Sequence, residues 1–272
     1  MMRKRLLVVL ILLPAGVAGI WSGGWFFLAV VWFFLLPAAW EYCKLFQVAG
    51  YQPTSVLVVG GVALLLFERS RGQFTNAPLL ITLLILLAMI LHLVAYERGR
   101  DLAASDFSLT VTGIMYIGWI GGYFISLRQL PDGNQWALLV LATVWIADSA
   151  AFSIGRRWGR HKLSTRLSPK KSWEGYFAGI VGGALSGIAF ALLFDWTVSG
   201  GTVFSWWQGG VVGFLSGAIP TLGDLGESMI KRQVGVKDSG SALPGHGGFF
   251  DRIDSWLWAA VIGYYFITWF FI

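Results

Sequence analysis

The stretch APLLITLLILLAMILHLVAY, residues 77–96, contains no charged side chain. A helix needs roughly 20 apolar residues to cross the hydrocarbon core of a membrane, so this stretch is long enough to do so once. Comparable apolar runs recur along the chain. Of the 272 residues, 56% are hydrophobic and 12% are charged, whereas a soluble domain carries about 25% charged residues. The sequence therefore predicts an all-α, polytopic integral membrane protein and excludes an ordinary soluble domain.

Nine segments of the chain are predicted to span the membrane. The first follows the basic start MMRKR and resembles a signal peptide, with a short apolar core followed by small residues. We expect it to be retained, because the next apolar run begins after only a Ser-Gly-Gly turn. The predicted spans are 5–21, 24–43, 54–69, 77–96, 107–127, 135–154, 174–194, 206–226 and 252–272.

The basic residues are divided unevenly between the two sides of these spans. With the N-terminus in the cytoplasm, all but Arg69, Arg71 and Arg128 of the 20 Lys and Arg residues lie on the cytoplasmic side. Because basic loops stay in the cytoplasm, we predict a cytoplasmic N-terminus and a location in the inner (cytoplasmic) membrane. Two spans separate the basic loops 155–173 and 227–251, which are therefore expected at one face. The net charge of +6 reflects these loops, and we expect no nucleic acid as a partner.

Small residues recur every four positions in the seventh and eighth predicted spans. This spacing places them on one helix face and lets two helix backbones approach closely. We therefore predict tight packing between these two spans, which connect the two basic loops. The two series are Gly175, Gly179, Gly183 and Gly187, and Gly209, Gly213 and Gly217.

Acidic residues at the membrane boundary form two pairs with helical spacing. Asp224 and Glu227 are three residues apart, as are Asp251 and Asp254 at the start of the last span, so each pair shares a helix face. Carboxylates within spans are costly and usually functional. Oxygen ligands of this kind suit Mg²⁺, and Asp148 at the end of the sixth span could join them. The alternative is an interfacial collar of acids paired with nearby basic residues.

The segment between the two acidic pairs combines glycines with cations. PGHGG, residues 244–248, is a turn whose backbone N–H groups can approach an anion closely. Lys231, Arg232, Lys237 and Arg252 add positive charge around it. A metal, backbone donors and basic side chains together describe a phosphate site. His246 could contact phosphate or could only cap the turn.

The other basic loop carries hydroxyls and lysines directly before a helix. Ser168, Lys170 and Lys171 precede the seventh span, and the start of a helix favours anions. The alternative is attraction of this loop to anionic lipid headgroups. Both readings hold together if a lipid phosphate is itself the substrate.

The run from Ser228 to Asp254 resembles the C-terminal motif of the CDP-diacylglycerol synthases, or phosphatidate cytidylyltransferases. The segment from Asp148 to Gly175 resembles a second region of the family, with Phe152 where the family often has tyrosine. The length and the multi-span layout also agree with the family. The residues that match the C-terminal motif are Ser228, Lys231, Arg232, Lys237, Asp238, Gly240, Leu243, Pro244, His246, Gly247, Gly248, Asp251, Arg252 and Asp254.

The resemblance implies that CTP and phosphatidic acid are converted, with Mg²⁺, into CDP-diacylglycerol and pyrophosphate. It implies that residues 1–130 form membrane-spanning helices for packing and possible lipid access. Residues 131–272 would form the catalytic membrane region, with both motif loops at the cytoplasmic face. CTP, phosphatidic acid and membrane lipids are the expected partners. A second metal ion and a homodimer are left open.

The residues expected at the site fall into three groups. Catalytic roles are expected for Asp224, Asp251, Lys231, Arg232, Lys237, Asp238, His246 and Arg252; substrate binding for Ser168, Lys170, Lys171, Ser228, Gly245, Gly247 and Gly248; and metal binding for Asp224 and Asp251, with Asp148, Glu227 and Asp254 close by.

Two other functions compete with this interpretation. A CTP-dependent lipid-alcohol kinase, for example a polyprenol kinase, would need a general base for its hydroxyl nucleophile, and no residue can be assigned to that role. A cation- or proton-coupled transporter would use intramembrane carboxylates, and Pro220 near Asp224 would suit its broken helices. The charged residues gather at one face rather than at the midplane, however, and the sequence shows no inverted repeat.

Overall fold

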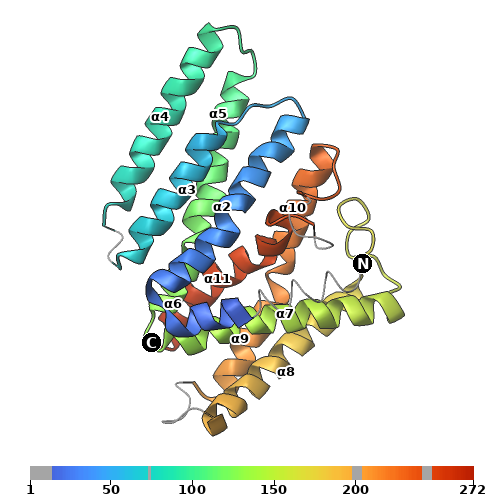
Figure 1. Ribbon diagram of the computed structural model, residues 1–272. Helices are drawn as coiled ribbons and strands as arrows, with labels where there is room; N and C mark the ends of the chain where they lie inside the picture. The colour runs from blue at the N-terminus through green and yellow to red at the C-terminus, as the bar shows by residue number, and fades with distance from the viewer. Residues whose placement is uncertain (1–13, 73–74, 198–203, 241–246) are drawn as a thin grey trace. The chain divides into compact units, whose positions relative to one another are not determined.

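The computed structural model describes residues 14–72, 75–197, 204–240 and 247–272, and within these ranges it contains helices and no strand (Figure 1). Residues 14–22 are helical. The helices that follow are α2 (Gly24–Val48), α3 (Ser55–Ser70), α4 (Ala77–Glu97), α5 (Ala103–Gly113), the π-helix η1 (Ile114–Trp119), α6 (Tyr123–Gln129), α7 (Gly133–Trp158), α8 (Trp173–Thr197), α9 (Trp206–Ala218), α10 (Thr221–Gln233) and α11 (Phe250–Phe270).

The chain divides into two compact units. The first comprises the chain up to Ser126 together with Ile230–Ile253, and the second comprises Leu127–Met229 together with Asp254–Ile272. Residues 230–253 group with the N-terminal helices in this division. The functional division expected at residue 130 stays a prediction. The boundaries fall inside α10 and α11, so each of these helices contributes residues to both units.

The first unit is a bundle in which α2 packs on α3, α3 packs on η1, and α4 packs on α5. Gly61 of α3 and Gly118 of η1 allow this close contact, because an added Cβ would lie 3.2 Å from Ile114 and 3.0 Å from Leu65, respectively. The Tyr42 hydroxyl donates to the Leu109 carbonyl at 3.1 Å and ties α2 to α5. These contacts hold α2 in place against α3 and α5.

The second unit is built on the glycine faces of α8 and α9. Gly179 lies against Gly217, and Gly183 and Gly187 lie against Gly213 and Gly209, so the two helices run antiparallel in steps of four residues. A Cβ at Gly217 would lie 2.9 Å from the Ile180 backbone, which leaves no room for a side chain. The tight packing predicted from the glycine spacing is confirmed. On its other side, α8 packs on α7.

The predicted eighth span, 206–226, is wrong as a single helix. Helix α9 ends at Ala218 and α10 begins at Thr221, because Pro220 has no N–H and disfavours the helical conformation of the residue before it. The Tyr176 hydroxyl donates to the Ala218 carbonyl at 3.2 Å and satisfies an acceptor released by the break. The break starts a new polar helix, α10, with Asp224 in its first turn.

The other predicted spans from residue 24 onward coincide with helices, and most of the first span lies outside the described residues. Among the described helices, five are long and apolar enough to cross a membrane: Gly24–Val48, Ala77–Glu97, Ala103–Gln129, Gly133–Trp158 and Trp173–Trp196.

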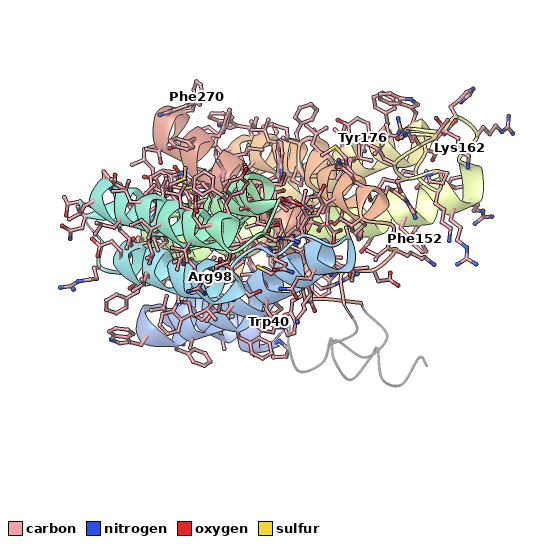
Figure 2. All side chains as sticks on the ribbon, turned by 90° about the horizontal axis from the view of Figure 1, so that it is seen from above. Trp40, Arg98, Phe152, Lys162, Tyr176 and Phe270 are labelled. Carbon is pink, nitrogen blue, oxygen red and sulfur yellow. The ribbon has the colours of Figure 1, made fainter. Side chains whose placement is uncertain are left out.

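Large apolar side chains are exposed on both units, as expected of surfaces that face lipid. Leu79 and Ile90 of α4 are 61% and 56% exposed. Trp40, Phe152 and Phe270 are exposed aromatic residues of other helices (Figure 2). The protein is therefore a multi-pass membrane protein, while the exact count of nine spans stays a prediction.

The glycine interface gives a stability prediction. Gly213→Ala should destabilise the protein by about 1–3 kcal/mol through overpacking, because the new Cβ would overlap the Gly183 backbone. Thermal unfolding in detergent measures the effect. Gly60→Ala in α3 is the matched control, since its Cβ meets nothing within 4 Å, and it should leave the melting temperature unchanged or raise it. Equal melting temperatures for both variants would contradict the close α8–α9 contact.

Candidate functional site

Three carboxylates of the second unit converge where α10 and α11 approach each other. Asp224 and Glu227 come from α10 and Asp254 comes from α11, and one oxygen of each lies within 4.8 Å of the others. Glu227 and Asp254 are 2% and 8% exposed. Gly223 permits the approach, because a Cβ there would lie 2.7 Å from the Trp258 ring. We call Asp224, Glu227 and Asp254 the carboxylate cluster.

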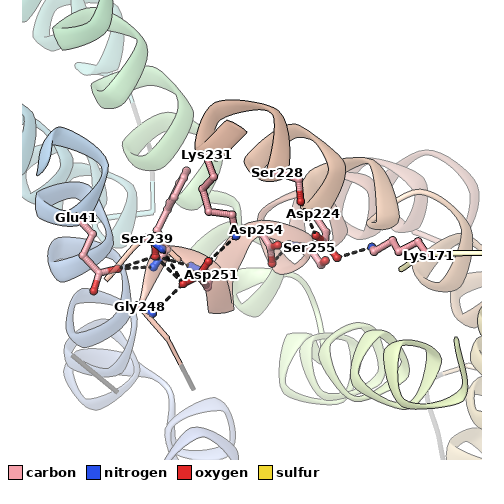
Figure 3. A network of polar contacts seen from close by, with 11 residues as sticks. Glu41, Lys171, Asp224, Ser228, Lys231, Ser239, Gly248, Asp251, Asp254 and Ser255 are labelled. Carbon is pink, nitrogen blue, oxygen red and sulfur yellow. Dashed lines mark hydrogen bonds and ion pairs between the residues drawn. The ribbon is translucent and has the colours of Figure 1, made fainter. Parts of the chain in front are cut away.

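Polar groups of the second unit contact two of these acids (Figure 3). Lys171 forms an ion pair with Asp224, and the Ser228 hydroxyl donates to Asp224 Oδ1 at 3.4 Å. The Ser255 N–H donates to Asp254 Oδ1 at 2.6 Å. The cluster thus brings three carboxylates within 4.8 Å of one another. Carboxylates this close repel one another unless a cation or protons compensate.

The donor set of the cluster fits a hard divalent cation. All three candidate ligands are carboxylate oxygens, which Mg²⁺ prefers, and the cluster includes neither histidine nor cysteine, the usual zinc ligands. Asp148 is exposed on α7 and acts electrostatically on Asp254 from within the same unit. Four of the five residues predicted to hold or surround a metal are therefore neighbours in the second unit.

The basic loop between α7 and α8 is folded back on itself. Glu174 accepts hydrogen bonds from the Arg160 N–H at 3.1 Å and from His161 Nδ1 at 2.6 Å. Lys162 and Ser172 form an isolated bridge. These contacts hold the two ends of the loop together.

The loop between α7 and α8 ends at Ser172, directly before α8. The Ser172 hydroxyl accepts from the Gly175 N–H at 3.2 Å, which satisfies a donor at the start of the helix. Lys171, directly before it, is thereby held where it pairs with Asp224. Lys170 is exposed and Ser168 is half-buried in the same turn. Within the second unit, this turn therefore lies beside the start of α10, where Asp224 is located. That the loops 155–173 and 227–251 share one membrane face stays a prediction.

Asp251 lies in a different environment in the first unit. Its Oδ1 accepts from Lys231 Nζ at 2.6 Å, and its Oδ2 accepts from the N–H groups of Ser239 at 3.0 Å and Gly248 at 2.8 Å (Figure 3). The side chains of Lys231 and Asp251 are 14% and 8% exposed. We call Lys231, Ser239, Gly248 and Asp251 the Asp251 network. Asp251 is not among the three acids of the carboxylate cluster, and its prediction as a metal ligand stays a prediction.

The remaining residues predicted for the motif differ in their exposure, and two of them are not described by the structure. Gly247 has a φ of +81°, a conformation that glycine adopts without strain, and a Cβ there would lie 2.7 Å from Asp251 Oδ2. Gly245 and His246 fall outside the described residues. The exposed residues of the motif are Arg232, Lys237, Asp238 and Arg252.

The sequence analysis did not include Glu41 of α2, which contacts the Asp251 network. Glu41 Oε2 accepts from the Ser239 hydroxyl at 3.2 Å and from the Phe250 N–H at 3.0 Å. The signal was present in the sequence, since a carboxylate inside an apolar span is a functional candidate by default. Glu41 was overlooked because it lies near the end of the predicted span 24–43, in a region that was expected to serve helix packing.

Comparisons with known proteins agree with the motif. Residues 3–270 match the cytidylyltransferase family. A phosphatidate cytidylyltransferase of Synechocystis sp. is 31% identical over 277 residues, which cover 90% of this chain and 89% of that protein. The enzyme of that name from Pseudomonas aeruginosa is 32% identical, covering 94% and 93%, and the one from Brucella suis biovar 1 is 37% identical, covering 77% and 70%. The chain belongs to the cytidylyltransferase family.

Proposed function

We infer that this chain catalyses the reaction of CTP with phosphatidate to give CDP-diacylglycerol and pyrophosphate. The observation that carries this conclusion is the family match from residue 3 to residue 270, together with relatives of that activity that align over most of both chains. An active site on a multi-pass helical protein suits the substrates, since one is a lipid and the other is soluble in water.

The reaction places modest demands on proton transfer. An oxygen of the lipid phosphate attacks the α-phosphorus of CTP, and the bond from that phosphorus to the bridging oxygen of the β-phosphate breaks. Pyrophosphate leaves with the electron pair. A phosphate monoester has a second pKa of about 6, so the phosphate of phosphatidate is already largely dianionic at neutral pH. The absence of an assignable general base from the motifs is therefore compatible with the chemistry.

The main difficulty is to bring two polyanions together and to stabilise the leaving group. We propose that Asp224, Glu227 and Asp254 hold Mg²⁺, on the basis of their mutual distance, their burial and their oxygen donors. When bound, the ion supplies positive charge for the phosphates and the leaving pyrophosphate. Lys171 offsets part of the charge of the carboxylate cluster through Asp224.

The basic residues around the motifs are proposed to bind phosphate groups. Lys170 is exposed in the turn before α8, so its side chain can reach a phosphate headgroup. Lys231 is held by Asp251 in a defined position. A lysine held in place can orient a bound anion better than a mobile lysine at the surface can. Ser168, Ser228, Arg232, Lys237, Asp238, Arg252 and the glycines 245, 247 and 248 keep the substrate-binding or catalytic roles proposed from the sequence.

A turnover assay tests the function. Purified protein in detergent receives either phosphatidate or a polyprenol, together with Mg²⁺ and CTP labelled at its α- or its γ-phosphate. Label from the α-position should appear in the lipid product, and γ-label should appear in pyrophosphate. Transfer of the γ-label to a polyprenol would instead support a lipid-alcohol kinase. Failure to form any labelled lipid in folded protein would contradict both enzymatic assignments.

The carboxylate cluster gives a second prediction. Asp224→Asn, Glu227→Gln and Asp254→Asn should each lower the rate by roughly 10²-fold or more, the scale of a lost electrostatic contribution, and should raise the Mg²⁺ concentration that gives half-maximal rate. Mg²⁺ should also raise the melting temperature of the parent protein, because it binds the folded state. That stabilisation should shrink in all three variants.

Two further variants sharpen this test. Asp195→Asn changes an exposed acid elsewhere on α8 and should leave both the rate and the Mg²⁺ response unchanged. Asp251→Asn decides the role of Asp251, because a ligand would shift the Mg²⁺ midpoint whereas a partner of Lys231 would lower the rate at saturating Mg²⁺. Normal Mg²⁺ midpoints in all three cluster variants would show that the metal binds elsewhere.

We also propose that the motif loops face the cytoplasm, on the basis of the asymmetry of basic residues along the chain. Single cysteines at Lys162 and Gln233, both exposed, in a Cys43→Ala background should react with a membrane-impermeant thiol reagent only after the inner face is opened. Reaction of both positions from the outer face of intact cells or spheroplasts would overturn the orientation.

A further inference from the structure

Glu41 is a buried carboxylate in a helix that could cross a membrane. Its side chain belongs to α2, and the residue is 7% exposed. Placing a carboxylate in such a setting is unfavourable unless it is compensated by hydrogen bonds or charge. None of the roles proposed above requires Glu41, so its burial calls for an explanation.

The hydrogen bonds of Glu41 connect it to the C-terminal motif. Glu41 Oε2 accepts from Ser239 Oγ, 198 positions away, and from the Phe250 N–H, 209 positions away. Phe250 is the first residue of α11, so Glu41 satisfies one of the N–H groups that a helix start leaves without a partner. A negative charge at this end of a helix is also favourable. Among the described residues, Glu41 Oε1 has no hydrogen-bond partner.

The second contact of Ser239 connects Glu41 to Asp251. Ser239 Oγ lies 2.9 Å from Asp251 Oδ2 and accepts from the Asp251 N–H at 3.2 Å. A hydroxyl has one proton, so it can donate to only one of the two carboxylates at a time. The Ser239 N–H remains bonded to Asp251 in either case. Ser239 therefore connects Glu41 to Asp251, and Glu41 also contacts the first turn of α11.

Two motif glycines leave the space that Glu41 occupies. A Cβ at Gly240 would lie 2.7 Å from the Glu41 carboxylate carbon, and a Cβ at Gly248 would lie 2.8 Å from it. Any larger residue at either position would displace the carboxylate or the loop. Glycine is therefore required at positions 240 and 248 because the Glu41 side chain of α2 occupies the space that a larger residue would need.

Aromatic contacts hold α2 and the start of α11 in this arrangement. Phe249 makes edge contacts with the rings of Phe33 and Phe34, at centroid distances of 5.4 and 6.1 Å. Phe250 is fully buried and lies 6.0 Å from the Tyr42 ring. The carboxylate therefore works within a packed contact and is not a mobile surface group.

We propose that Glu41 is a positioning residue for the reaction, which sets the Lys231–Asp251 pair by holding Ser239 and the first turn of α11. This inference rests on the proposed function. The role requires the hydrogen-bond acceptor of Glu41, so it predicts different effects for variants that keep or remove that acceptor. A glutamine can still accept both hydrogen bonds through its amide oxygen, whereas a methionine of similar size cannot.

The test compares Glu41→Met with Glu41→Gln at saturating CTP, phosphatidate and Mg²⁺. Glu41→Met should lower kcat by roughly 10- to 100-fold, the range found when a residue that orients a site is removed, with a smaller change in the KM for CTP. Glu41→Gln should restore most of kcat. Parent-like kcat in folded Glu41→Met, or equal loss in both variants, would overturn the proposal.

A matched control separates positioning from general destabilisation. Asp106 is also a buried carboxylate of the first unit, 1% exposed, which accepts from the Gln52 N–H at 2.6 Å. Asp106→Leu should lower the melting temperature while leaving the kcat of the folded fraction unchanged. Ser239→Ala combined with Glu41→Met should lose less than the product of the two single effects, because both act on one path. Fully independent effects would exclude the path through Ser239.

A readout that needs no turnover distinguishes this proposal from the proposed function. Hydrogen exchange at Gly248, Phe250 and Asp251 should be faster in Glu41→Met than in the parent, the Glu41→Gln or the Asp106→Leu protein. Absence of CDP-lipid formation by the parent would count against the function alone. Unchanged exchange in Glu41→Met would count against the positioning role, whatever the substrate.

Discussion

The close approach of α8 to α9 determines where the chemically active groups of the second unit lie. Because glycines face glycines in steps of four residues, the antiparallel register between the two helices is defined along their contact. Continued past Gly179 and Gly217, the same register brings the turn before α8 to the start of α10, where Lys171 meets Asp224. A side chain anywhere in the contact would separate the backbones and change that meeting. Packing of glycines thus determines where the ion pair of Lys171 with Asp224 forms.

Buried acids in this protein are compensated in two physically different ways. Glu41 and Asp251 accept hydrogen bonds from a serine, from backbone N–H groups and from Lys231, so their negative charge is met by protein donors. In the carboxylate cluster, the acids lie within 4.8 Å of one another with Lys171 as the ion-pair partner of Asp224. Since like charges so close together are unfavourable, a divalent cation is the natural complement. The first arrangement suits a rigid support, and the second suits a ligand site.

Much of the local structure was predictable from the sequence, because it depends on short-range patterns. Apolar runs indicated the helices, and the four-residue glycine spacing indicated the α8–α9 contact. The chemistry of Pro220 explains the break between α9 and α10, yet the surrounding apolar residues concealed it when hydropathy alone was considered. The Glu41 contact could not be placed, since 198 residues separate it from Ser239 and no periodic pattern connects distant helices. Its chemical signal, a charge in an apolar helix, was nevertheless visible.

The roles of Asp251 and Asp254 show the limit of reasoning from spacing. Three residues apart on one helix, they were expected to act as a pair. Ile253 between them is 1% exposed, and the surroundings of the two acids differ: Asp251 accepts from Lys231 and the motif backbone, and Asp254 lies with Asp224 and Glu227. The D-R-I-D sequence therefore places two acids with different surroundings within one helical turn. The first accepts hydrogen bonds from a lysine and from the motif backbone, and the second belongs to the proposed metal site. Both arrangements would suit a reaction between two polyanions, because its barrier is lowered chiefly by placing positive charge and holding it still.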